Sequence, residues 1–118
     1  MKARITVITL GVEDLERALR FYRDGLGFAT DGIIGTEFEH GAVVFIDLQH
    51  GLKLALWPRN SLARDSGLAL SPPCPIGLSL GHNVASRDEV DAVMKQAAHA
   101  GALIVKPPQV TLRGGYAG

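Results

Sequence analysis

Two stretches of this chain share one plan, and that internal repeat limits the folds open to the chain. Residues 5–10 alternate with a period near two and a β-branched bias, which predicts a strand with two usable faces. From Leu15 to Leu26, apolar residues recur at helical spacing. Asp14 is a suitable N-cap, and Gly25 and Gly27 are expected to end the helix by allowing a left-handed turn. The first stretch therefore predicts a strand followed by an amphipathic helix.

Residues 77–105 repeat this plan at a constant offset, with Val84 in the place of Val12 and similar matches through the helix. Ser86 and Glu89 predict a capping box, in which each side chain serves the backbone amide of the other residue. Two copies of strand, helix and strand in so short a chain predict a duplicated module.

Length, charge and cysteine content narrow the class of protein. A chain of 118 residues supports a single domain, and its formal net charge of zero removes the electrostatic case for nucleic acid or an anionic membrane as partner. The one cysteine, Cys74, cannot form an internal disulfide. No apolar run has the length of a membrane span, and no signal peptide precedes the first strand. We therefore expect a cytoplasmic protein.

The first module is predicted to occupy residues 1–57 and to have the order β, α, β, β, β. After the helix, residues 28–31 are expected to begin a second strand. Residues 42–48 and 52–57 are β-rich runs joined by a turn at 49–51, which predicts a hairpin.

A linker at 58–75 and an incomplete second module at 76–118 are predicted to follow. The linker ends in a proline-rich segment, and Asn60 or Ser61 could cap a short helical turn over residues 62–65. In the second module we expect strands over residues 77–81 and 102–106. Two more strands would complete the repeat, and at most part of one is expected before the chain ends, so this module is predicted to be truncated at its C-terminus.

The residues of the first helix also carry a family resemblance. The phrase VxDLxRxxxFYxDxLGF, from Val12 through Phe28, resembles the opening of a vicinal oxygen chelate module, the superfamily of glyoxalases, bleomycin-resistance proteins and extradiol dioxygenases. The segment HNVASRDEVDAVMKQAAHAGA with its following KPP resembles the start of that family's second module. The resemblance implies an α+β fold in which two βαβββ modules with curled mixed sheets enclose a cleft.

The same resemblance implies where a metal site would lie. Metal-dependent members hold a divalent ion with His and Glu side chains from four strands, and the first three of these positions fall at Val7, Ala55 and Ser79. The fourth would lie beyond Gly118. Because none of the three residues is a metal ligand, we expect no metal site and no cofactor. A different alignment would make His82 a candidate metal ligand, but the shift that this needs would break the match of Val84 with Val12.

Other chemically active residues have ordinary explanations. His40 and His50 sit at turns, His99 lies near a helix C-terminus, and Cys74 lies among prolines without a visible partner. Asp47 could act as a base or fix a polar ligand, or it could face water at a strand end. Residues 114–118 are interpreted as a connection into a missing strand rather than as a phosphate loop.

What remains is a predicted small-molecule cleft. If Val7 points inward, Thr9 does too, and so do Ala55, Lys53 and Trp57 of the later strand. Trp57 with Phe45 would then supply flat apolar walls. The alternative is that these side chains fill the core between the sheets. The candidate ligand-binding residues are Thr9, Phe45, Asp47, Trp57, Ser79 and Tyr116.

Two functions of different class follow from the resemblance. The first is a metal-free binding protein for a small molecule, either an antibiotic or an aromatic compound, that acts as a homodimer. The alternative is a lyase, isomerase or dioxygenase of the same superfamily, which would recruit a metal through other residues or use acid-base groups such as Asp47 or Tyr116. A purely structural role is a third reading.

Overall fold

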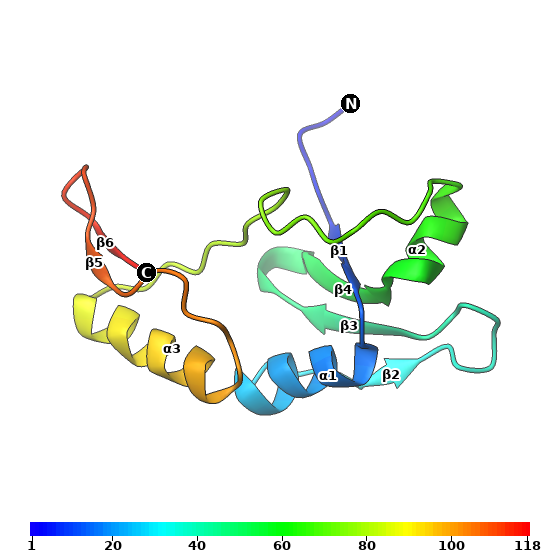
Figure 1. Cartoon of the computed structure of the whole chain (residues 1–118), viewed down its shortest axis with the longest axis horizontal. Helices are drawn as coiled ribbons and strands as arrows, with labels where there is room; N and C mark the ends of the chain where they lie inside the picture. Colours follow the sequence, from blue (N-terminus) through cyan, green and yellow to red (C-terminus); the bar gives the residue numbers. More distant parts are fainter. The chain divides into compact units, whose positions relative to one another are not determined.

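The computed structural model describes residues 1–118 and divides them into two compact units, Met1–Pro72 and Pro73–Gly118 (Figure 1). Their shared boundary falls within the residues expected to form a linker.

The first unit is built on a four-stranded mixed sheet. Its spatial order is β1-β4-β3-β2, and β1 runs parallel to β4 while the other neighbours are antiparallel. A parallel pair requires a long crossover connection. The segment between β1 and β4, which contains the first helix and the strands β2 and β3, supplies it. The strands are β1 (Val7–Val12), β2 (Ile33–Ile34), β3 (Val43–Asp47) and β4 (Lys53–Pro58).

Helix α1 (Leu15–Leu19) continues into a wider π-helical turn, η1 (Arg20–Gly25). The predicted cap at Asp14 is confirmed, because the amide of Arg17 donates to Asp14 Oδ1 at 3.0 Å. Gly27 follows with φ of 77°, the left-handed conformation that the sequence predicted at the end of this helix. The same prediction for Gly25 is wrong, because Gly25 is still part of η1 and has no positive φ.

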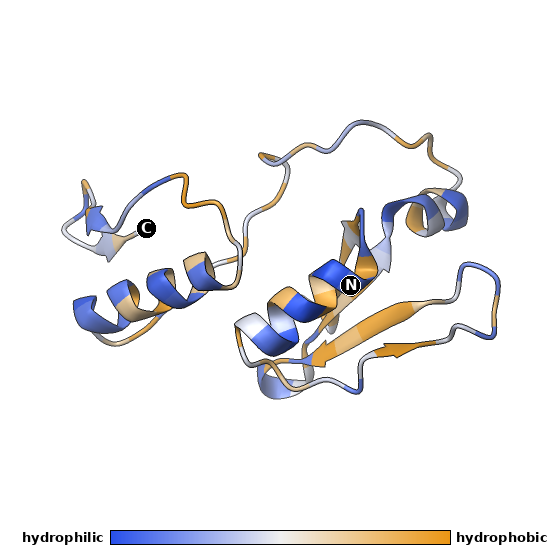
Figure 2. Cartoon of the chain, turned by 60° about the horizontal axis from the view of Figure 1, so that its bottom comes forward, coloured by the Kyte–Doolittle hydropathy of each residue, from blue (hydrophilic) through white to orange (hydrophobic).

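The core lies between α1 and one face of this sheet. Alternate residues of each strand point to it, as the period of two requires, and the strands are strongly apolar in Figure 2. The buried side chains of the core are those of Leu15, Leu19, Val44, Ile46, Leu54 and Leu56.

The hairpin that joins β3 to β4 was predicted from the sequence and is confirmed. Its turn, Gln49–Gly51 (η2), places both His50 and Gly51 at positive φ. The strand expected at residues 28–31 is wrong, since β2 is confined to Ile33–Ile34. There the hydroxyl of Thr30 donates to the carbonyl of Phe45 and accepts from the amide of Gly32. These side-chain hydrogen bonds of Thr30 take the place of strand-to-strand backbone hydrogen bonds, so residues 28–31 form a loop.

A full helix, α2 (Arg59–Ser66), stands where only a short helical turn was predicted. Neither Asn60 nor Ser61 caps it: the helix starts directly after Pro58, and the side chain of Asn60 accepts from the neighbouring amide of Ser61. Gly67, at φ of 71°, ends the helix.

The second unit consists of one long helix and a short hairpin. The helix is α3 (Arg87–His99), and the hairpin pairs β5 (Gln109–Val110) with β6 (Tyr116–Ala117). The cap at Ser86 is confirmed, with its hydroxyl accepting from the amide of Glu89 at 3.2 Å. The return half of the box differs from the prediction, because Glu89 Oε2 accepts from the amide of Ala85.

The other predictions for this unit need correction. Residues 77–81 and 102–106 form no strand, because no neighbouring backbone pairs with them. Residues 114–118, interpreted as a connection, contain β6, and Gly114 at φ of 79° makes the turn that returns the chain to β5. The prediction of two copies of one module, with the second truncated, stays a prediction.

The two units differ in burial. Every buried side chain belongs to the first unit, and residues 73–118 include none. No helix combines the length and the apolar character that crossing a bilayer requires.

Candidate functional site

The candidate site is the sheet face of the first unit that points away from α1. The strand register places Ala55 between Thr9 of β1 and Phe45 of β3, and it places Lys53 between Val7 and Asp47. Directly paired residues share a face. The prediction that Val7, Thr9 and Ala55 lie on one face is therefore confirmed.

This face keeps large apolar side chains in solvent. Val7 is 44% exposed, Phe45 is 38% exposed and Ile34, on the edge strand, is 47% exposed. A group of exposed apolar side chains on a rigid sheet is typical of a surface that binds something. The same strands carry the core on their other face, so the position of these side chains is fixed.

A pocket of about 310 Å³ opens on this face beside β2, β3 and β4. Its lining combines apolar and charged groups: Asp31, Gly32, Ile34, Phe45 and Lys53. The Thr30 hydroxyl, 2.6 Å from the Phe45 carbonyl oxygen, holds the loop that carries Asp31 against β3. This anchor keeps the backbone at Asp31 close to β3, and both Asp31 and Phe45 line the pocket.

Of the two charged side chains that line this pocket, Lys53 has an ion-pair partner and Asp31 has none. Lys53 Nζ donates to Asp47 Oδ1, and the pair joins neighbouring strands. Asp31 takes part in no ion pair. Asp47 is the last residue of β3 and its side chain is mostly exposed, which also fits the alternative that it faces water at a strand end.

The positions that the resemblance implies for metal ligands do not fit a metal ion here. Val7 carries only an isopropyl group, and Ala55 offers only a methyl group beneath its neighbours, so neither side chain has a donor atom for a metal ion. Ser79 lies outside any strand. No group of three or more His, Cys, Asp or Glu side chains is arranged to hold a metal ion.

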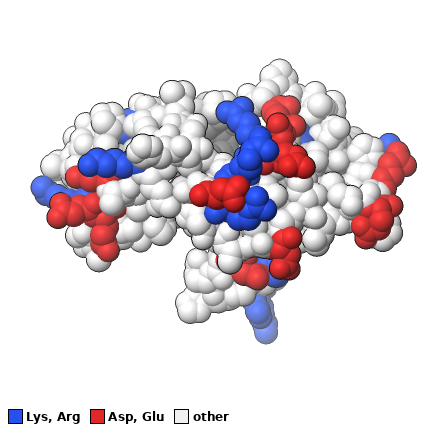
Figure 3. Space-filling view, turned by 90° about the horizontal axis from the view of Figure 1, so that it is seen from below, with Lys and Arg blue, Asp and Glu red and all other residues white.

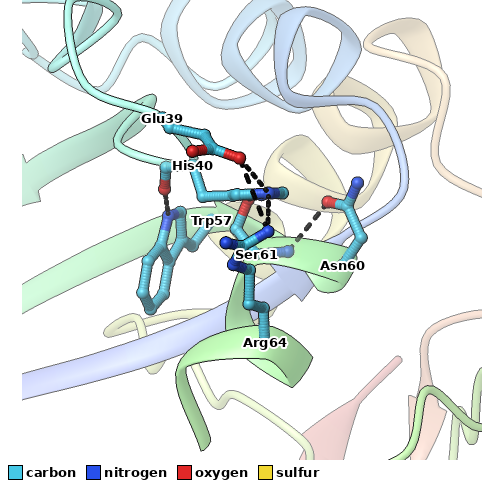
Figure 4. Close-up of polar contacts among 6 residues, drawn as sticks. All are labelled: Glu39, His40, Trp57, Asn60, Ser61 and Arg64. Atoms are coloured by element: carbon cyan, nitrogen blue, oxygen red, sulfur yellow. Dashed lines mark hydrogen bonds and ion pairs between the residues drawn. The ribbon is translucent and has the colours of Figure 1, made fainter. Parts of the chain in front are cut away.

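Trp57 is tied to a polar cluster at the end of β4 (Figure 4). Its indole Nε1 donates to the carbonyl oxygen of His40 at 3.0 Å, and His40 itself has φ of 58°. The imidazole contacts two residues of α2, with Nδ1 3.2 Å from Ser61 Oγ and Nε2 3.2 Å from Arg64 Nη1. Figure 4 shows these side chains converging on the imidazole ring from the loop and the helix.

The contact with Arg64 selects one tautomer of the neutral imidazole. A guanidinium can only donate, so the contact with Arg64 requires Nε2 of His40 to accept. The ring proton then lies on Nδ1 and points at Ser61 Oγ. Glu39 completes the cluster, with Oε1 3.5 Å from Arg64 Nη1.

This Ser-His-Glu arrangement does not resemble a working hydrolase site. Ser61 is only 4% exposed, so its hydroxyl is closed to a substrate, and in this tautomer Nδ1 of His40 donates to Ser61 instead of acting as its base. The cluster holds the loop before β3 against α2. Sequence reasoning missed it because its members come from separate segments that only the fold brings together.

Tyr116 and Ser79, the remaining predicted ligand-binding residues, belong to the second unit. The Tyr116 hydroxyl donates to Asp91 Oδ1 at 2.8 Å, and this bond is the main reason that the pKa of the phenol is raised. The guanidinium of Arg87 lies 5.4 Å from the ring centroid. Tyr116 therefore stays protonated at neutral pH, which argues against its use as a base.

A shallow groove of about 140 Å³ lies beside Tyr116 in the second unit, lined by the first turns of α3, by the preceding segment and by the chain end. It contains His82, which has no metal-ligating partner there.

Four of the six predicted residues thus belong to one sheet: Thr9, Phe45, Asp47 and Trp57. Sequence reasoning missed Asp31 and Ile34, because residues 28–31 were expected to be a strand. Lys53 was correctly predicted to face the same side as Ala55, but it was not among the candidate ligand-binding residues.

The charged side chains visible in Figure 3 include both signs in mixed order. The equal totals of basic and acidic residues agree with this, and neither sign dominates that view.

The mixed sheet, with α1 on one face and α2 covering only the Gly11 end of the other, defines an α+β protein of the glyoxalase type. Residues 4–118 match the family model described as Glyoxalase/Bleomycin resistance protein/Dioxygenase superfamily, and the chain belongs to this superfamily. No curated protein matches the sequence.

Solved structures agree with this assignment. A glyoxalase-related enzyme from Fulvimarina pelagi is 32% identical, with a TM-score of 0.78, over 97% of this chain and 76% of that chain. A hypothetical protein from S. aureus is 26% identical, with a TM-score of 0.71, over 98% of this chain and 82% of that one. Lactoylglutathione lyase from Agrobacterium tumefaciens is 21% identical, with a TM-score of 0.60 and coverage of 98% and 83%. The last match concerns the fold alone.

Proposed function

We propose that this chain is a small-molecule binding protein that works without a metal ion and takes its ligand on the open sheet face of the first unit. The observation that carries the proposal is the pocket beside Phe45 and Ile34, where apolar side chains remain exposed on a rigid sheet. The antibiotic-binding members implied by the sequence resemblance set the precedent for this class.

The residue types support binding rather than metal-assisted chemistry. Val7, Ala55 and Ser79 carry none of the His, Cys, Asp or Glu groups that hold divalent ions. A metal-dependent lyase or dioxygenase would need coordinating groups at these positions.

Size and shape indicate the kind of ligand. A volume of about 310 Å³ lies at the lower end of small-molecule sites and suits one or two rings. The Phe45 ring offers an aromatic surface for stacking. We therefore infer a planar or aromatic ligand, which includes aromatic antibiotics.

A matched pair of phenylalanine variants tests the site. Naphthyl compounds are expected to bind the wild-type chain in equilibrium dialysis, to bind Phe45→Ala several-fold more weakly, and to bind Phe38→Ala normally. Phe38 is the control because its ring is 69% exposed and lies outside the pocket. Equal loss in both variants, or no binding by the wild type, would contradict the proposal.

Metal analysis separates the binding protein from the alternative enzyme. Protein purified without chelators is expected to contain no stoichiometric zinc, nickel, manganese or iron. A near-equimolar metal content that survives dialysis would favour a lyase, isomerase or dioxygenase and overturn the metal-free proposal.

We also propose a homodimer. Apolar side chains of the second unit lie in solvent, with Ile76 93% exposed, Leu103 85% exposed and Val105 86% exposed. Covering such side chains is favourable, and a second copy of the chain is the partner always present. Sedimentation velocity over a range of concentrations is expected to show a dimer. A monomer at the highest concentration would contradict it.

A further inference from the structure

We infer that the pocket beside Phe45 selects ligands that join an aromatic body to a positively charged group. This inference rests on the proposed function and adds the charge of the ligand to it. Three features of the pocket carry the argument: an unpaired carboxylate, a lysine already neutralised by a partner, and an apolar floor.

The unpaired carboxylate is that of Asp31. It lines the pocket with Lys53, yet Lys53 donates to Asp47, and Asp31 takes part in no ion pair. Asp31, Asp47 and Lys53 together therefore carry a net charge of about −1. An incoming cation meets an available partner in Asp31.

An incoming anion meets the opposite situation. Lys53 is the only basic side chain of the pocket, and its ammonium already bonds to Asp47 across the strands. An anionic ligand must compete with that carboxylate and approach Asp31 as a like charge, which weakens its binding.

The fold holds the Asp31 segment beside the apolar floor. The hydroxyl of Thr30 donates to the carbonyl of Phe45 at 2.6 Å and accepts from the amide of Gly32 at 3.2 Å, so the residues on either side of Asp31 are tied to β3. Ring stacking on Phe45 and charge pairing with Asp31 can therefore occur in one ligand. Thr30 acts here as a positioning residue.

Three probes of similar size test the charge preference: naphthylmethylamine as the cation, naphthylmethanol as the neutral compound and naphthoate as the anion. At low ionic strength and neutral pH, the wild-type chain is expected to bind the cation about two- to fivefold more tightly than the neutral compound. Naphthoate is expected to bind most weakly. The preference for the cation should shrink in high salt, because the charges are exposed.

Substitutions assign the preference to individual charges. Asp31→Asn is expected to remove the advantage of the cation and to leave binding of the neutral compound unchanged. Asp65→Asn is the matched control, because it removes the same charge from α2, outside the pocket. Lys53→Met is expected to act in the opposite direction and to strengthen binding of the cation, because it frees Asp47.

Thr30→Val tests the positioning role. Loss of the bond to the Phe45 carbonyl is expected to reduce the cation preference while binding of the neutral compound persists. Circular dichroism on each variant confirms that the sheet is retained.

The outcomes separate two failures. Binding of all three probes with equal affinity, or strongest binding of naphthoate, would overturn the charge inference and leave the binding proposal standing. Absence of binding by every probe would overturn both. A cation preference that Asp65→Asn removes and Asp31→Asn keeps would also overturn the assignment to this pocket.

Discussion

Ser61 is the only buried polar residue of the chain, and its hydroxyl faces the imidazole of His40. Ser61→Ala would leave the Nδ1 proton of His40 without its partner in a partly buried position. We expect a loss of about 1–3 kcal/mol in the free energy of unfolding of the first unit. Urea unfolding followed by Trp57 fluorescence measures it, since Trp57 belongs to the same cluster.

Ser66→Ala provides the control for this substitution. Ser66 ends the same helix in solvent, so its loss is expected to stay within about 0.5 kcal/mol. Equal effects of the two substitutions would show that the His40 cluster adds nothing to stability.

Alanine substitutions at two glycines can distinguish the cost of a steric collision from the cost of a left-handed backbone. Gly35 and Gly51 have nearly the same positive φ, 76° and 78°. A Cβ at Gly35 would lie 2.3 Å from the carbonyl oxygen of Gly41, whereas one at Gly51 would meet nothing within 4 Å. Gly51→Ala is expected to cost about 1–2 kcal/mol through its left-handed backbone alone.

Gly35→Ala is expected to cost clearly more than Gly51→Ala, because the loop before β3 must also shift away from Gly41. Thermal unfolding of both variants measures the difference. Equal costs would mean that the loop yields freely and that only φ matters.

At the scale of single residues, sequence reasoning could assign faces but not partners. Alternation along one strand correctly placed Val7 with Thr9, and Lys53 with Ala55. The pairing of Lys53 with Asp47 and the approach of Asp31 to Phe45 depend on strand register and on a loop anchor. These are tertiary features that local periodicity does not contain.

Among the elements, α3 tests how much a cap contributes to a helix without buried residues. Ser86 accepts from the amide of Glu89, and no side chain of α3 is buried. Ser86→Ala is expected to destabilise α3 by about 1 kcal/mol. Amide exchange in the first turn of α3 should quicken accordingly.

Ser79→Ala is the control for the cap, because Ser79 is exposed and outside any helix. The same change in exchange for both variants would show that the cap has no specific effect.

The hydrogen bond from Tyr116 of β6 to Asp91 of α3 depends on pH. Hydrogen bonding to Asp91 raises the pKa of Tyr116 above its ordinary value near 10. The folded chain therefore keeps this proton longer than the unfolded chain does, so the stabilisation is complete below pH 10 and is lost as the pH rises through the raised pKa. Tyr116→Phe is expected to remove this pH-dependent loss.

Phenolate absorbance during an alkaline titration measures the pKa of Tyr116. The titration is repeated in Tyr22→Phe, because burial also raises the pKa of Tyr22 and its phenolate would contribute to the same signal. Titration of Tyr116 at its ordinary value in the Tyr22→Phe variant would contradict the bond to Asp91.

Elements whose hydrogen bonds are local could be predicted from the sequence, whereas strands that need a distant partner could not. The hairpin of β3 and β4 and the helices α1 and α3 rely on local bonds and on caps that the sequence shows. Residues 77–81 have strand-like alternation, yet a strand needs a partner backbone that no local pattern supplies. Asn60 was expected to cap a helix, but its side chain serves its neighbour's amide.

At the scale of the whole molecule, the unequal burial of the two units has a thermodynamic consequence. The core of the first unit joins α1 to the sheet, whereas residues 73–118 bury no side chain. Since hydrophobic burial is the main source of stability, the amides of α3 are expected to exchange faster than those of β3 and β4 in dilute protein.

The proposed homodimer makes that difference depend on concentration. If a second copy covers the exposed apolar side chains of residues 76–80 and 103–105, protection there and in α3 should rise with protein concentration, while β3 and β4 stay unchanged. Hydrogen exchange measured by mass spectrometry at two concentrations on either side of the dimer dissociation constant follows both regions in one sample. Equal protection of α3 and β3 in dilute protein would contradict the burial argument. Protection that stays constant while sedimentation shows a dimer forming would mean that the dimer uses another surface.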